Sequence, residues 1–353
     1  MEKEFKPVSE EAVRLYKEAE EKILFLLDQK LKTASRLGHS VLTVETRLFI
    51  QMVSDLFCKT VVGVYEFDLY DQLEKEYFWF LSLLLNRDMP QKCFEHLVKQ
   101  WDMGVHTFIN TSAANELVAP VGFLQNGFTG SRITEKTKPP VLSEDGEHLI
   151  SFLIEKDLDK ASEKIFSLQK QGMSTETILL ELFPAVLNKV NLLWENNEIS
   201  VADQFVATDI CRYLLVKLTE HLKKEKQIKN KVIAVCVPGE TQDMTAAVMG
   251  VFLKLKGWDV RSTGQISQHV DMLQVVLEIK PDIIFLSIDM IARLSAATAI
   301  LTEIRKLLPQ TKIILGGTAA VSAKKRLSLF SDAIVQDFAE GHQLALELIK
   351  KDA

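Results

Sequence analysis

Apolar residues recur at helical spacing through the first third of the chain. Between charged positions, they fall at Ala12, Tyr16, Ala19, Ile23 and Leu26. Similar stretches lie near 45–62, 67–86 and 91–112. Because this spacing is typical of amphipathic helices, it predicts an N-terminal bundle of about four helices over residues 1–119. Proline and glycine then interrupt the pattern, and we expect a linker or a long ordered loop over residues 120–143.

A second helical unit is expected over residues 144–222. Ser174 precedes an apolar helical pattern and is a suitable N-cap for it. Pro184 lies inside that pattern, so we expect it to kink the helix. The polar segment WENNEIS at 194–200 separates this helix from the next one. Residues 144–222 are therefore predicted to form an all-α unit of several short helices.

Short apolar runs alternate with helical patterns from residue 231 to residue 353. The strands are expected at 232–237, 259–263, 282–287, 312–315 and 332–336. Helices are expected near 242–256, 268–279, 293–308 and 320–329, with a last one closing the chain. Five strands that alternate with helices predict an α/β domain with a parallel, doubly wound sheet. In such a sheet ligands bind outside the carboxyl ends of the strands, so we look for a site in the loops that follow them.

Composition narrows the classes of partner and compartment. Hydrophobic residues make up 47% of the chain, as is usual for a globular protein. The net charge of −6 argues against a nucleic acid or an anionic membrane as the main partner. No apolar run reaches the length of a membrane span. The four cysteines are scattered without a CxxC pair, as is usual in a reducing compartment. We therefore expect a cytoplasmic protein.

The loops after the strands carry a family resemblance. The first loop reads PGETQDMT at 238–245, which is neither GxGxxG nor a P-loop. The other matching pieces are LS at 286–287, LGG at 315–317 and DAIVQDFAEG at 332–341. With these pieces the domain resembles the cobalamin-binding domain of methionine synthases, corrinoid carriers and B12-dependent photoreceptors. Residues 183–214 resemble the helical cap that precedes it in the same proteins. The resemblance covers about 145–350 and implies a flavodoxin-like (Rossmann-like) fold with five parallel strands behind an all-α cap.

The resemblance assigns candidate cofactor-binding residues in the first loop. The family pattern there is Gly-Asp/Glu-x-His-x-x-Gly, in which the histidine binds cobalt and the acidic residue tunes it. Glu240 keeps the acid, but Gln242 stands in place of the histidine. Thr245 stands where the second glycine admits the nucleotide tail of cobalamin.

Further candidates come from the cap and from the other loops. Trp194 matches a tryptophan that covers the upper face of the corrin ring, and Asp203 and Gln204 replace the Glu-His pair that follows it in photoreceptor-type caps. Ser287 and Gly317 match family positions that line the tunnel for the nucleotide tail of cobalamin, and Gly316 is a further cofactor-binding candidate beside them. His269 follows the second strand and can ligate heme or bond a propionate, although a residue in this position is more often a surface histidine at a helix start.

The replacement of histidine by glutamine changes the chemistry that the site can support. A neutral imidazole is a good ligand for a transition metal, whereas a carboxamide retains hydrogen bonding without that basicity. We interpret the site as a tetrapyrrole pocket without a protein ligand on the metal. Its candidate cofactors are cobalamin on its own nucleotide base and a metal-free bilin such as biliverdin, with heme as a third. The alternative is a pocket that binds no cofactor.

The sequence therefore predicts a sensory or regulatory protein and no catalytic residues. The layout of helical unit, cap and α/β domain is similar to that of photocobilins, which bind B12 and biliverdin as light sensors. We expect a conformational or oligomeric change, in a homo-oligomer such as a dimer, that signals to a separate downstream protein. Two alternatives remain: a corrinoid carrier of a methyltransferase system, and a cofactor-free regulator that binds another protein.

Overall fold

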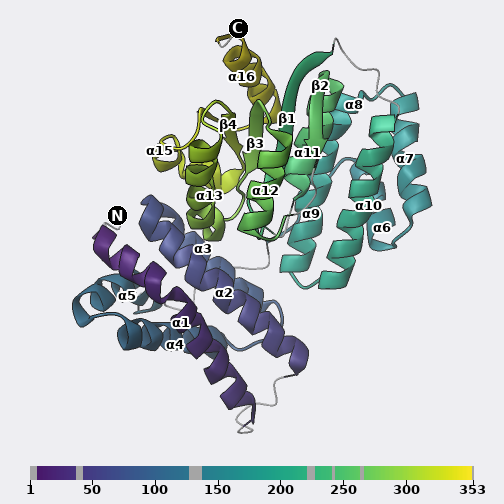
Figure 1. Ribbon diagram of the computed structural model, residues 1–353. Coiled ribbons are helices and arrows are strands. Elements are labelled where there is room, and N and C mark those ends of the chain that lie inside the picture. The colour runs from purple at the N-terminus through teal and green to yellow at the C-terminus, as the bar shows by residue number, and fades with distance from the viewer. Residues whose placement is uncertain are drawn as a thin grey trace. The chain divides into compact units, whose positions relative to one another are not determined.

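The chain divides into two compact units, 1–136 and 137–353. The structure is a computed structural model that describes residues 6–36, 43–126, 137–220, 227–240, 243–262 and 266–351. Figure 1 shows the first unit as helices alone, and the second as a parallel sheet with helices around it.

The described part of the first unit holds five helices. They are α1 (Glu10–Arg36), α2 (Val44–Phe67), α3 (Tyr70–Leu85), α4 (Gln91–Phe108) and α5 (Thr111–Asn126). The prediction that the helical pattern ends before Pro120 was wrong, because α5 continues through this proline to Asn126. Pro120 cannot donate a backbone hydrogen bond, but it is buried together with Leu117 and Leu124. Apolar packing thus stabilises a helix that local signals alone would end.

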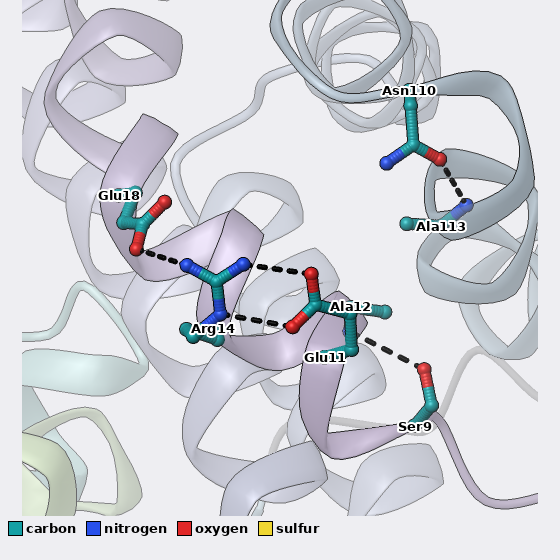
Figure 2. A network of polar contacts seen from close by, with 7 residues as sticks. All are labelled: Ser9, Glu11, Ala12, Arg14, Glu18, Asn110 and Ala113. Carbon is teal, nitrogen blue, oxygen red and sulfur yellow. Dashed lines mark hydrogen bonds and ion pairs between the residues drawn. The ribbon is translucent and has the colours of Figure 1, made fainter.

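Short polar contacts fix the helix ends of this unit (Figure 2). Ser9 Oγ accepts from the amide of Ala12 at 3.3 Å, and Asn110 Oδ1 accepts from the amide of Ala113 at 3.1 Å. Both bonds satisfy amides that have no partner within the first turn of a helix. On the exposed side of α1, Arg14 forms ion pairs with carboxylates one turn away on either side.

The second unit begins with the cap helices. They are α6 (Glu144–Ile154), α7 (Leu158–Lys170), α8 (Thr175–Thr177), the π-helical turn η2 (Ile178–Leu182), α9 (Phe183–Glu195) and α10 (Val201–Glu220). Ser174 caps α8 as predicted, because its hydroxyl accepts from the amide of Thr177 at 3.0 Å. Pro184 does not kink the middle of a helix. It lies in the first turn of α9, where a missing N–H costs little, directly after the π-helical turn.

The α/β part confirms the predicted fold class. Its strands are β1 (Ile228–Cys236), β2 (Trp258–Ser262), β3 (Ile283–Ser287), β4 (Lys312–Gly316) and β5 (Ala333–Ile334). All neighbouring strands are parallel, in the order β2-β1-β3-β4-β5, which is the flavodoxin-like order. The central strand β3 is buried along its whole length, as expected for a sheet that is covered on both faces.

Helices connect these strands and cover the sheet (Figure 1). They are α11 (Met244–Leu255), α12 (His269–Ile279), the 3-10 turn η3 (Ile291–Arg293), α13 (Leu294–Leu307), α14 (Thr318–Ser322), α15 (Lys324–Leu327) and α16 (Phe338–Lys351). The single helix expected at 320–329 is divided into α14 and α15. In the cap, α10 packs along α11, and one apolar core runs from the cap into the sheet. The cap and the carboxyl end of β1 therefore lie in one packed body.

Two apolar helical stretches of the described chain have the length and composition of a membrane span. They are Val44–Phe67 and Thr175–Glu195. Core helices of globular proteins meet the same criterion, and 67% of the most apolar window of Val44–Phe67 is buried within the protein. Length and composition are therefore weak evidence for a membrane span here.

Candidate functional site

The carboxyl ends of three strands meet at one level of the sheet. Cys236 of β1 pairs with Ser287 of β3, and Ser287 pairs with Gly316 of β4. The pairing continues past the strands, because the amide of Val237 donates to the Ser287 carbonyl at 3.0 Å and the amide of Ile288 donates to that of Gly316 at 2.9 Å. The loops that follow β1, β3 and β4 thus leave the sheet side by side, as a ligand site in this fold requires.

Asp289 organises the loops after β3 and β4. Its carboxylate accepts from the hydroxyl of Ser287 at 2.8 Å and from the amide of Thr318 at 3.2 Å. Gly317 has a φ of +95°, and a Cβ at this position would lie 2.4 Å from the carbonyl oxygen of Ile288. Only glycine fits this close approach. Ser287 and Gly317 therefore have structural roles at this edge, beyond the tail tunnel that the sequence assigns to them.

Glu240 is a buried acid in the segment between β1 and α11, which we call the β1 loop, with 1% of its surface exposed. Burial raises its pKa to about 8, and the charge of Asp289 adds to this effect. The guanidinium of Arg293 and the backbone amides of Met290 and Asp289 act in the opposite direction. Desolvation is the largest cause, so Glu240 is a mostly neutral carboxylic acid at pH 7 that can donate a hydrogen bond.

Arg293 brings a positive charge to this edge that the sequence analysis did not single out. It ends the 3-10 turn after β3, and its guanidinium covers Gly239, where a Cβ would lie 3.3 Å from Nη1. Gly239 has a φ of +80°, so its lack of a side chain serves both the turn and this contact. The signal in the sequence was an arginine within the apolar run MIARL at 290–294.

A second arginine, Arg212 of α10, connects the cap to the β1 loop. Its guanidinium donates to both carboxylate oxygens of Asp243, at 2.8 and 2.7 Å. Asp243 is buried and is the residue from which α11 begins. Since 31 positions separate the two residues, their pairing is a product of the fold. Asp243 had drawn no attention in the sequence because the family pattern leaves its position free.

The predicted cap residues have partners within the cap. Asp203 accepts from the amide and the hydroxyl of Ser200 at 3.0 and 2.6 Å, and Ser200 Oγ in turn accepts from the amide of Asp203. This reciprocal pair is a capping box at the start of α10. A hydrogen bond with Lys156 is the first cause that lowers the Asp203 pKa to about 2. Gln204 donates to Asn191 of α9 at 3.0 Å.

The cap also contributes Trp194 and an apolar side of α10 to the candidate site. Trp194 is half-buried in the last turn of α9. Val201 and Phe205 are 53% and 56% exposed, and with Arg212 they are spaced by four and seven residues, which places all three on one side of the helix. Arg212 contacts Asp243 at the start of α11, so the exposed apolar residues Val201 and Phe205 lie on the same side of α10 as this contact with the α/β part.

The other predicted residues lie at the starts of helices or outside the described residues. Thr245 is half-buried in the first turn of α11. Gln242 lies outside the described residues. His269 begins α12, and its Nε2 lies 3.4 Å from a carboxylate oxygen of Glu303 on α13. The structure therefore brings Glu240, Ser287, Gly316 and Gly317 together at the strand ends. His269 instead contacts Glu303 on the neighbouring helix α13.

These residues suit a flat macrocycle that is held by shape and hydrogen bonds. The described residues contain no cluster of three or more His, Cys, Asp or Glu side chains placed for a metal ion. A Cβ at Gly316 would meet only Val335, at 3.8 and 4.0 Å, so this glycine borders space that is not tightly filled. Apolar surface on α10 and a neutral acid at Glu240 match the apolar ring and the polar periphery of a tetrapyrrole.

Comparison with known families identifies these two parts of the chain. A B12 binding domain model matches residues 230–347, and a second B12 binding domain model matches residues 147–218. The first match covers the five strands and the second covers the cap helices. No curated protein is similar in sequence to this chain at a significant level.

Three solved structures are similar at low sequence identity. The Methanosarcina barkeri monomethylamine corrinoid protein is 16% identical, with a TM-score of 0.48, over 57% of this chain and 96% of that one. A cobalamin-binding protein from Desulfitobacterium hafniense DCB-2 is 17% identical, with a TM-score of 0.31, over 59% and 99%. The methanol:cobalamin methyltransferase complex of Methanosarcina barkeri is 15% identical, with a TM-score of 0.33, over 65% and 92%.

The family assignment rests on the two family models, since similarity at these identities and scores adds no argument about function. The models agree with the order of cap and sheet in the structure. Residues 147–218 and 230–347 therefore match B12 binding domains, the first as a helical cap and the second as an α/β domain.

Proposed function

We propose that this chain is a regulatory protein that holds a tetrapyrrole between its cap and its α/β domain, without a protein ligand on the metal. The supporting observation is the pair of Gln242 in the sequence and buried Glu240 in the structure. Where the family pattern uses the acid to tune a histidine, Glu240 here faces Asp289 and Arg293. An amide beside a neutral acid can bond the periphery of the ring, but it is a poor ligand for cobalt.

The residues around the proposed site have distinct tasks. A bound corrin or bilin supplies an absorbing ring whose state changes with light or redox conditions. Val201 and Phe205 exclude water from one face of that ring, and Trp194 covers its outer part. Glu240 holds a proton at its carboxyl group and donates it in a hydrogen bond to a carbonyl of the ligand. Arg293 offers a positive charge to a ligand carboxylate, if the ligand carries one.

We further propose that the signal is light and that it leaves the protein through a partner. A change in the ring would move α10 relative to the β1 loop, and the ensemble of cap positions would shift accordingly. The helical unit at residues 6–126 would pass this shift to a second copy of the chain or to a downstream protein. The proposal includes a cytoplasmic location and neither a nucleic acid nor a membrane as partner.

A corrinoid carrier of a methyltransferase system is the second candidate. It is favoured by the order of cap and α/β domain, which both B12-binding models match in one chain. Gln242 weighs against it, because the carrier would have to keep cobalt reactive without the imidazole of its family pattern. The carrier reading predicts methyl transfer from a donor to a thiol acceptor in the presence of the loaded protein.

One experiment separates these functions. The full chain is produced in cells supplied with cobalamin, biliverdin or heme, and the absorption spectrum is recorded before and after illumination. We expect a bound cobalamin or bilin whose spectrum changes with light, together with a light-dependent change in elution volume. A loaded protein that is inert to light but supports methyl transfer would replace the sensor with the carrier. A colourless protein in all three cultures would refute both.

A further inference from the structure

Two ion pairs of the described chain connect the cap to α11. Arg212 of α10 binds Asp243, from which α11 begins, and Glu176 of α8 binds Lys256, which follows the end of α11. At 1.5 Å per residue, the two pairs are separated by roughly 20 Å along this helix. Only the Arg212–Asp243 pair adjoins the β1 loop.

The two pairs also differ in geometry and burial. Arg212 makes two hydrogen bonds to Asp243, at 2.8 and 2.7 Å, and the carboxylate is 5% exposed. Lys256 makes one contact of 2.9 Å with Glu176, whose side chain is 41% exposed. A bidentate guanidinium–carboxylate pair fixes distance and orientation, whereas a lysine contact fixes distance alone. The Arg212–Asp243 pair is therefore the more rigid of the two connections.

The position of this pair gives it a specific consequence. Phe205 precedes Arg212 by seven residues, about 10 Å along the helix axis on the same side of α10. Glu240 precedes Asp243 by three residues in the opposing loop. The Arg212–Asp243 pair thus connects α10, which carries Phe205, to the loop that carries Glu240. These are the two surfaces between which the ligand is proposed to bind.

We infer that Arg212 and Asp243 are positioning residues that set the separation between α10 and the β1 loop, and so determine whether a tetrapyrrole fits between them. This inference rests on the proposed function and names the contact by which the cap responds to the ligand. The bond geometry keeps the loop and the cap in register before the ligand enters. Preorganisation of this kind favours binding, because less freedom is lost when the ligand binds.

The test compares a double variant with a matched control in the full chain. Arg212→Met with Asp243→Asn removes both charges, so that no buried carboxylate is left unpaired. Glu176→Gln weakens the other connection between the cap and α11. Each protein is titrated with cobalamin and with biliverdin, and amide hydrogen exchange is measured without ligand over the first two turns of α11, residues 244–250.

We expect the double variant to bind tetrapyrrole at least tenfold more weakly and to exchange the amides of 244–250 at least tenfold faster. Glu176→Gln should change neither quantity by more than about twofold. Equal effects in both proteins, or unchanged exchange in the double variant, would overturn the inference, since the pair would then be an ordinary stabilising contact. If the unaltered chain binds no tetrapyrrole, the proposed function falls, and the exchange data alone decide the inference.

Discussion

The raised pKa of Glu240 predicts that the ligand-free protein loses stability as pH rises. In the folded chain the pKa is about 8, against an ordinary value of 4.5. Between these values the unfolded chain has released the proton while the folded chain still holds it, so the unfolded state binds fewer protons. By linkage, the free energy of unfolding then falls with rising pH. The stability that this group contributes is full below pH 4.5 and lost by about pH 8.

The magnitude follows from the same two values. At about 1.4 kcal/mol for each pH unit, the interval corresponds to about 5 kcal/mol for this one buried carboxyl. That is a large share of the roughly 5–15 kcal/mol that stabilises an ordinary domain. Glu240→Gln keeps the shape of the neutral acid but cannot ionise. The variant should therefore match the unaltered chain near pH 4.5 and be more stable by several kcal/mol at pH 8.

Urea unfolding at pH 5, 6, 7 and 8 measures this difference in the free energy of unfolding. The transition is monitored by a spectroscopic signal from the α/β part. Glu278→Gln on α12 is the matched control, because it removes an exposed carboxyl from the same part of the chain. Only the Glu240 variant should diverge from the unaltered chain as pH rises. Parallel stability curves for all three proteins would refute the reasoning, since Glu240 would then ionise as freely in the folded chain as in the unfolded one.

Three further predictions test the site. Gln242→His should give bound cobalamin the absorption of a histidine-ligated corrinoid, which the unaltered chain should lack; identical spectra would contradict this. Gly317→Ala should lower the free energy of unfolding by roughly 2–4 kcal/mol, because its φ is +95° and its Cβ would meet the carbonyl of Ile288. Gly172→Ala, with a φ of +101° but nothing within 4 Å of its Cβ, should cost only roughly 1–2 kcal/mol in the same urea assay. Phe205→Ser should weaken tetrapyrrole binding about tenfold in a titration without shifting the urea midpoint.

The sheet was predictable because its strands are short, continuous apolar runs. A strand that is buried on both faces, such as β3, leaves this signal in the sequence whatever its neighbours are. The order of strands and helices then followed from their alternation. The fold class also predicted that Glu240, Ser287 and Gly317 lie at or just beyond the carboxyl ends of adjacent strands, and the pairing of β1, β3 and β4 agrees with this.

Features that depend on tertiary contacts were not predictable from the sequence. Pro120 predicted the end of a helix, but burial beside Leu117 overrides the lost hydrogen bond. The sequence placed Asp203 in the cofactor site but did not reveal that its carboxylate caps α10 through Ser200. The Arg212–Asp243 pair joins residues whose proximity exists only once the cap has packed along α11.

The central claim is that a tetrapyrrole binds between the cap and the α/β domain with no side chain on its metal. Equilibrium titration of the purified full chain with cobalamin, biliverdin and heme, followed by absorption, tests it most directly. We expect saturable binding of cobalamin or biliverdin, one per chain, and a spectrum of bound cobalamin that shows no histidine ligand from the protein. Failure of both to bind, or a histidine-ligated spectrum in the unaltered protein, would contradict it.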